Sequence, residues 1–86
     1  EEERLVVNEV KELGPQIEAV ILKVQAHVKK QRDACVLVEQ FVEITDQKTY
    51  DRLNDATPER FAHLAEVEFQ TGLMYLVRAV AQPSTF

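Results

Sequence analysis

The stretch Pro15–Thr45, PQIEAVILKVQAHVKKQRDACVLVEQFVEIT, carries the most regular pattern in the chain. Its core-type positions are spaced alternately four and three residues apart, the heptad period of helices that pack along one stripe. The stripe consists of Ile17, Ile21, Val24, Val28, Gln31, Cys35, Val38, Val42 and Thr45. Val20, Ala34 and Phe41 widen it on one side, as in a helix of a globular bundle. The pattern predicts one long helix over about 15–45, flanked by partner helices.

The same period continues backward through Leu13, Val10 and Val6, across the pair Gly14-Pro15. Glycine followed by proline is a strong stop signal, because proline removes an amide donor and clashes with the preceding turn. The pair is therefore either a turn between two helices or a kink within one. We favour a turn that ends a first helix over about 2–13.

Two more helical segments follow. Tyr50 and Leu53 lie three residues apart among charged residues, which predicts a short helical turn near 47–54. Thr57-Pro58-Glu59 then supplies an N-cap hydroxyl, a proline at the first helical position and an acid in the first turn, so a last helix should span about 58–82.

Together these segments predict an all-α fold. We expect a small bundle of three main helices (about 2–13, 15–45 and 58–82) with coiled-coil-like packing, forming one domain over 1–82, and a tail over 83–86. The residues expected in its core are Val24, Val28, Val38, Phe61, Phe69, Leu73 and Leu76.

Composition excludes several classes of protein. The 86 residues include ten Lys and Arg against fifteen Asp and Glu, a net charge of −5, which argues against binding nucleic acid through phosphate attraction. The single cysteine, Cys35, excludes an intramolecular disulfide framework; at a stripe position it is expected in the core, and it favours a reducing, cytoplasmic (intracellular) location. The longest nearly uncharged run, 69–82, is shorter than the roughly 20 residues of a membrane span.

The last helix has a second apolar stripe besides the one expected to face the core. A helix that is apolar on two sides must be buried on both or docked against another molecule. We expect this second stripe to bind a protein partner through Leu64, Val67, Thr71, Met74 and Tyr75.

Gln31 interrupts the long stripe with a polar side chain. It either sets the register of helix pairing, because a buried amide finds a partner only in the correct alignment, or is turned to solvent by a local kink.

His27 and Lys30 form a His-x-x-Lys pair that resembles histidine phosphotransfer domains, but those place a small residue after the lysine, where this chain has Gln31. Glu59, His63, Glu66 and Gln70 align on one helix face, yet a single helix offers too few ligands for a metal. No catalytic residues are found, and we expect neither an enzyme nor a cofactor.

The pattern favours a protein–protein interaction and oligomerisation module that acts by helix-to-helix docking. Because the chain opens with Glu1 instead of Met, we expect it to come from a larger intracellular scaffold, adaptor or cytoskeletal/trafficking protein. Its partners should be proteins, including a second copy in a dimer, with no nucleic acid and no membrane span. The alternative is a small-ligand-binding or histidine phosphotransfer bundle that uses His27 or His63.

Overall fold

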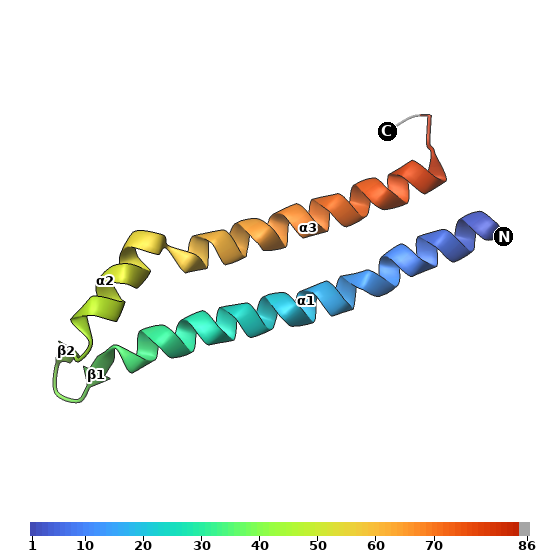
Figure 1. The fold of residues 1–86 in the computed structure, drawn as a ribbon. Coiled ribbons are helices and arrows are strands. Elements are labelled where there is room, and N and C mark those ends of the chain that lie inside the picture. Colours follow the sequence, from blue (N-terminus) through green and yellow to red (C-terminus); the bar gives the residue numbers. More distant parts are fainter. Residues whose placement is uncertain (85–86) are drawn as a thin grey trace.

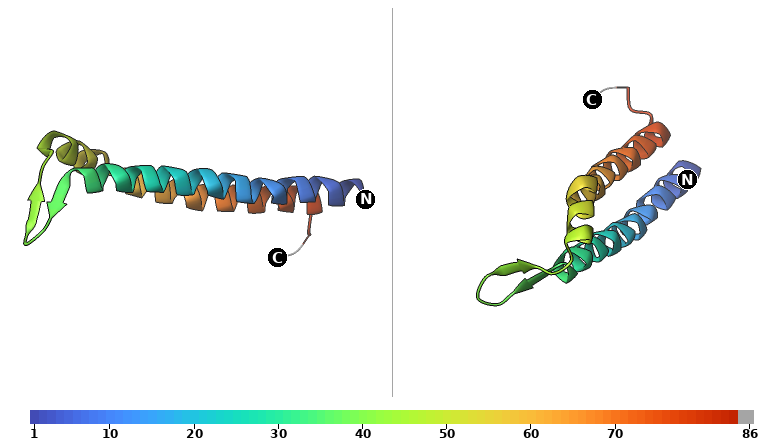
Figure 2. Two further views of the ribbon diagram at one scale, coloured as in Figure 1. Left: turned by 90° about the horizontal axis from the view of Figure 1, so that it is seen from below. Right: turned by 60° about the vertical axis from the view of Figure 1, so that its left-hand side comes forward.

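The computed structural model describes residues 1–84 and shows an extended helical hairpin (Figure 1). Two long helices run side by side in opposite directions, and the end where the chain reverses holds a small sheet and a short helix (Figure 2). The elements in chain order are α1 (Glu2–Ala34), β1 (Val36–Val38), β2 (Val42–Ile44), α2 (Gln47–Ala56) and α3 (Pro58–Ala81). The fold is mostly helical, as predicted, but it has two long helices and the short α2 where the sequence predicted three main helices over 2–13, 15–45 and 58–82.

Helix α1 passes through Gly14 and Pro15 without a turn, so the predicted break between helices at 2–13 and 15–45 is wrong. Pro15 lacks the amide hydrogen that would bond the carbonyl of Lys11, a loss confined to one turn. Packing on both sides of Gly14 compensates for it, because Val10 and Ile17 are both half-buried. The heptad period that continued in phase across the pair was the correct signal.

The predicted helix over 15–45 also ends early, because the chain after Ala34 forms the hairpin of β1 and β2. The strands pair antiparallel, with Val36 opposite Ile44 and Val38 opposite Val42. Residues four apart share a face of a helix, but Val38 and Val42 are also four apart and face each other across the hairpin. The heptad count therefore could not separate the two structures here. The high content of β-branched residues was the local signal for strands.

Cys35 joins α1 to the β-hairpin of β1 and β2, and it is the most buried of the described residues, at 1% exposure. Its backbone amide donates to the carbonyl of Arg32 at 3.0 Å, and its own carbonyl accepts from the amide of Thr45 at 2.7 Å. Its thiol donates to the carbonyl oxygen of Gln31 at 3.2 Å. The expectation that Cys35 is a core residue is confirmed.

Helices α2 and α3 are separated by a single residue, Thr57. Asp46 caps α2 by accepting a hydrogen bond from the backbone amide of Thr49 at 3.1 Å, and the segment predicted as a turn near 47–54 is a complete helix. Helix α3 begins at Pro58, as predicted. Thr57 has φ 45°, in the left-handed region, and its hydroxyl makes no capping hydrogen bond within the described chain, so the predicted hydroxyl cap is wrong.

The core is a thin seam between the helices. The buried apolar residues of the described chain are Ile21, Val28, Cys35, Leu53 and Ala62. Among the predicted core residues Val28 is buried and Leu73 is half-buried. The others are exposed: Val24, Val38, Phe61, Phe69 and Leu76. The prediction required a separate first helix over 2–13 to cover those on α1 and α3, but residues 2–13 continue the line of α1, and Val38 lies in β1.

The hairpin therefore exposes far more surface than a compact protein. Its accessible surface is 7239 Å², whereas a folded monomer of 9.9 kDa exposes roughly 5,200 Å². Its radius of gyration is 19.3 Å, against about 12 Å for a compact domain of this length. Neither long helix in the described chain is apolar enough along its length to cross a bilayer. Of the predicted tail over 83–86, Thr85 and Phe86 lie outside the described residues.

Candidate helix-docking surfaces

Most of the residues predicted to bind a partner lie on the side of α3 that faces away from α1, and Met74 lies on a flank, one residue after the α1-facing Leu73. Ala62, Leu73 and Val80 form the line of α3 residues that faces α1. Successive residues of a helix are rotated by about 100° about its axis, so Leu64 and Thr71 lie nearly half a turn away from this line. We call Leu64, Val67, Thr71, Met74 and Tyr75 the outer strip. Met74 and Tyr75 are its most exposed members, at 71% and 67%.

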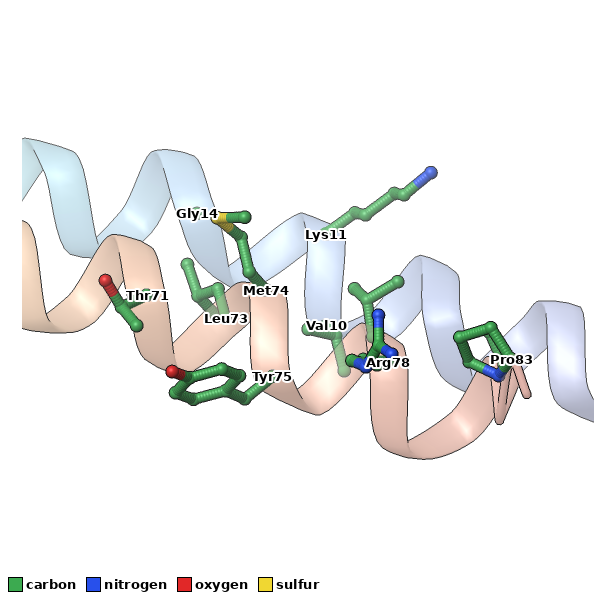
Figure 3. Close-up of a pocket in the computed structure, with 11 residues that line it drawn as sticks. Val10, Lys11, Gly14, Thr71, Leu73, Met74, Tyr75, Arg78 and Pro83 are labelled. Carbon is green, nitrogen blue, oxygen red and sulfur yellow. The ribbon is translucent and has the colours of Figure 1, made fainter. Parts of the chain in front are cut away.

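Three members of the outer strip also border a groove at the open end of the hairpin. The groove has a volume of about 910 Å³ and combines the N-terminal half of α1 with the C-terminal half of α3 (Figure 3). Thr71, Met74 and Tyr75 line it from α3, and Val10 and Lys11 line it from α1. Leu64 and Val67 lie outside it. The structure therefore divides the predicted site between a groove and a plain helix surface.

A second exposed apolar surface was not predicted. On α1 it consists of residues that directly precede those facing α3: Val6 precedes Val7, Leu13 precedes Gly14 and Val20 precedes Ile21. Val24 lies on the same flank. All four flank side chains are exposed, and Val20 is open over 59% of its surface.

Helix α3 has a matching flank. Phe61 precedes Ala62, Gly72 precedes Leu73 and Leu76 precedes Val77, where the second residue of each pair packs toward α1. Phe69 lies between this flank and the contact line. In two antiparallel helices that face each other, the same rotation away from the contact line leads to the same side of the pair. Both flanks therefore belong to one face of the hairpin.

We call this surface the apolar face. Its large exposed side chains are Val6, Leu13, Val20, Val24, Phe61, Phe69 and Leu76. None of these positions carries a charge, although His27, directly before Val28, lies on the same flank of α1. On α3 the small residues Ala65 and Gly72 lie between the large ones, and Ala79 follows them.

The opposite flanks of the same helices are largely polar. On α3 this side carries the line Glu59, His63, Glu66 and Gln70, and on α1 it carries Lys11, Glu18, Gln25 and Lys29. The two flanks of the helix pair therefore differ in polarity, although the exposed Leu22 and Met74 add apolar surface to the polar side.

A polar cluster around Arg32 holds the closed end of the hairpin together. Nε of Arg32 donates to both carboxylate oxygens of Glu59 at 2.8 Å, one guanidinium nitrogen donates to Oδ1 of Asn54 at 2.9 Å, and the other to the carbonyl of Leu53 at 3.3 Å. The hydrogen bond from Arg32 lowers the pKa of the Glu59 carboxyl below its ordinary value, and the same bond raises the pKa of Arg32. Glu59 is thus engaged in an ion pair between α1 and α3.

The other polar candidates remain separate from one another. His27 and His63 are both exposed on different helices, and no group of three or more His, Cys, Asp or Glu residues in the described chain could hold a metal. Gln31 is half-buried, and its side chain makes no hydrogen bond with the described residues. Its predicted role in register is untested by this geometry.

No protein-family model matches the chain, and no curated protein shows significant sequence similarity to it.

The apolar face could have been detected in the sequence, since its residues were already recognised as apolar stripes. They were assigned to the intramolecular core because a third helix was expected to cover them. The Arg32–Glu59 pair had no comparable signal, because the two residues are far apart in the sequence and become neighbours only when the hairpin closes.

Proposed function

We propose that this chain is a protein–protein interaction and oligomerisation module that works by docking its helices against helices of another chain. One observation carries the proposal: a hairpin with few buried residues exposes apolar side chains along both long helices. Roughly 2,000 Å² more surface is open than a compact protein of this mass exposes. A standard interface removes about 800 Å² from each partner, so the excess is large enough for one or more partners.

The outer strip and the apolar face offer two distinct docking surfaces on this module. Both follow the heptad spacing that lets one helix pack along another, so coiled-coil-like packing belongs to the assembled state in this proposal. Methionine and tyrosine on the outer strip are suited to a protein partner, since Met74 can adapt its shape and Tyr75 combines an apolar ring with a polar hydroxyl. We propose that the module serves a cytoplasmic scaffold, adaptor or cytoskeletal/trafficking protein.

Analytical ultracentrifugation of the chain over a wide concentration range tests the proposal. We expect masses above the monomer and a helical circular dichroism spectrum. A chain that is helical and monomeric at every concentration up to the millimolar range would contradict it, because so much apolar surface would then be stable in water.

Charged substitutions on each surface sharpen the test. Val20→Glu on the apolar face, or Met74→Glu on the outer strip, should abolish assembly through the altered surface while leaving helicity unchanged, since a charge in a dry interface loses its water. Leu22→Glu is the matched control, because Leu22 is 56% exposed and belongs to neither surface. Assembly that survives both substitutions would exclude both surfaces.

A further inference from the structure

We infer that the apolar face is covered by a second copy of this chain, related by a two-fold axis that crosses the helices at right angles. In this arrangement α1 lies antiparallel to α1 of the partner, and α3 lies antiparallel to α3 of the partner. The inference rests on the proposed function and specifies the occupant of one of its two surfaces. It is carried by the pattern of residue sizes, the charges beside the face and the register of the hairpin.

Such an axis requires that the residues of α1 on the apolar face match in pairs about one midpoint. Within the apolar face Leu13 pairs with Val24; Val20 pairs with the half-buried Ile17 beside the face, and Val6 falls opposite the polar, half-buried Gln31. Each pair has the same midpoint, between Glu18 and Ala19. An antiparallel copy therefore places Leu13 against Val24 and Ile17 against Val20, with the polar Gln31 only in the outermost layer.

The exposed charges next to this flank are self-complementary in the same sense. The N-terminal half of α1 carries the acids Glu9 and Glu12, and the C-terminal half carries Lys23 and Lys30 with His27 between them. When a second α1 lies antiparallel about the midpoint between Glu18 and Ala19, the acids of one copy lie beside the basic residues of the other. A parallel copy would bring acids beside acids and bases beside bases, which is unfavourable.

On α3 the apolar face alternates large and small residues. Phe61, Phe69 and Leu76 are large, and Ala65, Gly72 and Ala79 between and beyond them are small. When the two-fold axis passes between Gln70 and Thr71, Phe69 of one copy lies opposite Gly72 of the other, and Leu76 lies opposite Ala65. Phe61 lies within one residue of the position opposite Ala79. Large side chains of one copy thus meet small ones of the other, as close packing requires.

Gly72 shows that this space is open before assembly. A β-carbon built on Gly72 would have no other atom of the described chain within 4 Å, apart from its own helix backbone and chain neighbours. Glycine within a helix costs about 1 kcal/mol relative to alanine, and nothing inside the hairpin requires it at this position. A phenylalanine ring from a second copy can lie there without meeting a side chain.

A single axis must cross both helices at one level, which is an independent condition. The midpoint of α1 lies between Ile17 and Ile21, and the midpoint of α3 lies between Phe69 and Leu73. All four of these residues line one shallow cavity between the helices. The register of the hairpin therefore brings the two midpoints level, although they were derived from separate patterns on separate helices.

Distances between nitroxide labels test the arrangement in the assembled chain. With Cys35→Ala as background, one label is placed by Arg4→Cys and another by Ala19→Cys, both at exposed positions outside the apolar face. Because a helix rises 1.5 Å per residue, labels at position 4 in the two copies are about 44 Å apart along the direction of the helices. Labels at position 19 are separated only by the width of neighbouring helices, whose axes lie roughly 10 Å apart.

A much longer separation at position 4 than at position 19 supports the inference. Equal separations at both positions would show that the two α1 helices run parallel and would overturn it, while leaving the proposed module intact. A monomer at every concentration would overturn both. Dimers whose labels at position 19 are far apart would place the second copy on another surface and would also overturn the inference.

Gly72→Leu provides a second test that does not depend on labels. The side chain enters open space in the isolated hairpin, so helicity should be retained, but it fills the gap that Phe69 of the other copy needs. We expect dimerisation to weaken about tenfold or more. Ala26→Leu, an exposed substitution outside the apolar face, is the matched control and should leave dimerisation unchanged. Equal dimerisation of both variants would overturn the inference.

Discussion

Phe69→Ala separates the stability of the hairpin from the stability of its assembly. Phe69 is 49% exposed, so half of its side chain is buried within the hairpin and the other half is available to a second copy. Complete burial of a phenylalanine is worth about 3 kcal/mol. The substitution should therefore cost about 1.5 kcal/mol in unfolding of the monomer, well below the ~3–5 kcal/mol of a fully buried phenylalanine.

The assembled state should lose more, because both copies carry the substitution. Two half-exposed rings are worth about 3 kcal/mol on assembly, which weakens dimerisation roughly a hundredfold. Sedimentation at graded concentrations measures the second effect, and denaturant unfolding at the lowest concentration measures the first. Leu22→Ala is the control and should change dimerisation little. A monomer destabilised by ~3–5 kcal/mol with unchanged dimerisation would place Phe69 in an intramolecular core and refute the reasoning.

Four further predictions concern single positions. Met74→Glu should leave both helicity and the apolar-face dimer intact, and collapse of the helical signal would assign Met74 to the fold itself. Thr57→Gly should stabilise the hairpin by about 1 kcal/mol in thermal unfolding, because glycine adopts the left-handed φ of 45° without a β-carbon clash; a lower melting temperature would contradict this. Gln31→Leu should raise the melting temperature and broaden the nitroxide distances, whereas lower stability with unchanged distances would show that Gln31 satisfies a buried partner. Finally, Arg32 lowers the pKa of the Glu59 carboxyl below its ordinary value of 4.5, so folding favours the carboxylate. This stabilisation is complete above pH 4.5 and is lost as the pH falls through the lower pKa of the folded chain. Thermal scans from about pH 6 to pH 3 should therefore show a smaller loss of stability in acid for Glu59→Gln than for the unaltered chain.

Local signals in the sequence located several elements correctly. Thr57-Pro58-Glu59 marked the start of α3, because a proline at the first helical position is favoured by the backbone of one turn alone. The spacing of Tyr50 and Leu53 marked α2, and Leu53 is buried in the structure. These features depend on residues within a few positions of one another.

The errors arose where a local signal had two solutions. Gly14-Pro15 is compatible with a turn or with a continuous helix, and packing of both flanking turns against α3 selects the helix. The spacing of Val38 and Val42 is compatible with a helix and with a pair of antiparallel strands, and pairing of β1 with β2 selects the strands. In each case contacts with a distant or facing segment made the choice.

The amino-acid sequence by itself determined that the chain is mostly helical and that its helices carry more than one apolar stripe, because helix period, caps and proline positions act within a turn or two. Only the tertiary structure decided which stripe is buried. With residues 2–13 continuing α1, the hairpin has one seam between two helices, so Phe61, Phe69 and Leu76 are left on an exposed face. Whether an apolar side chain is core or surface depends on how many helices surround it, and the heptad pattern is the same in both cases.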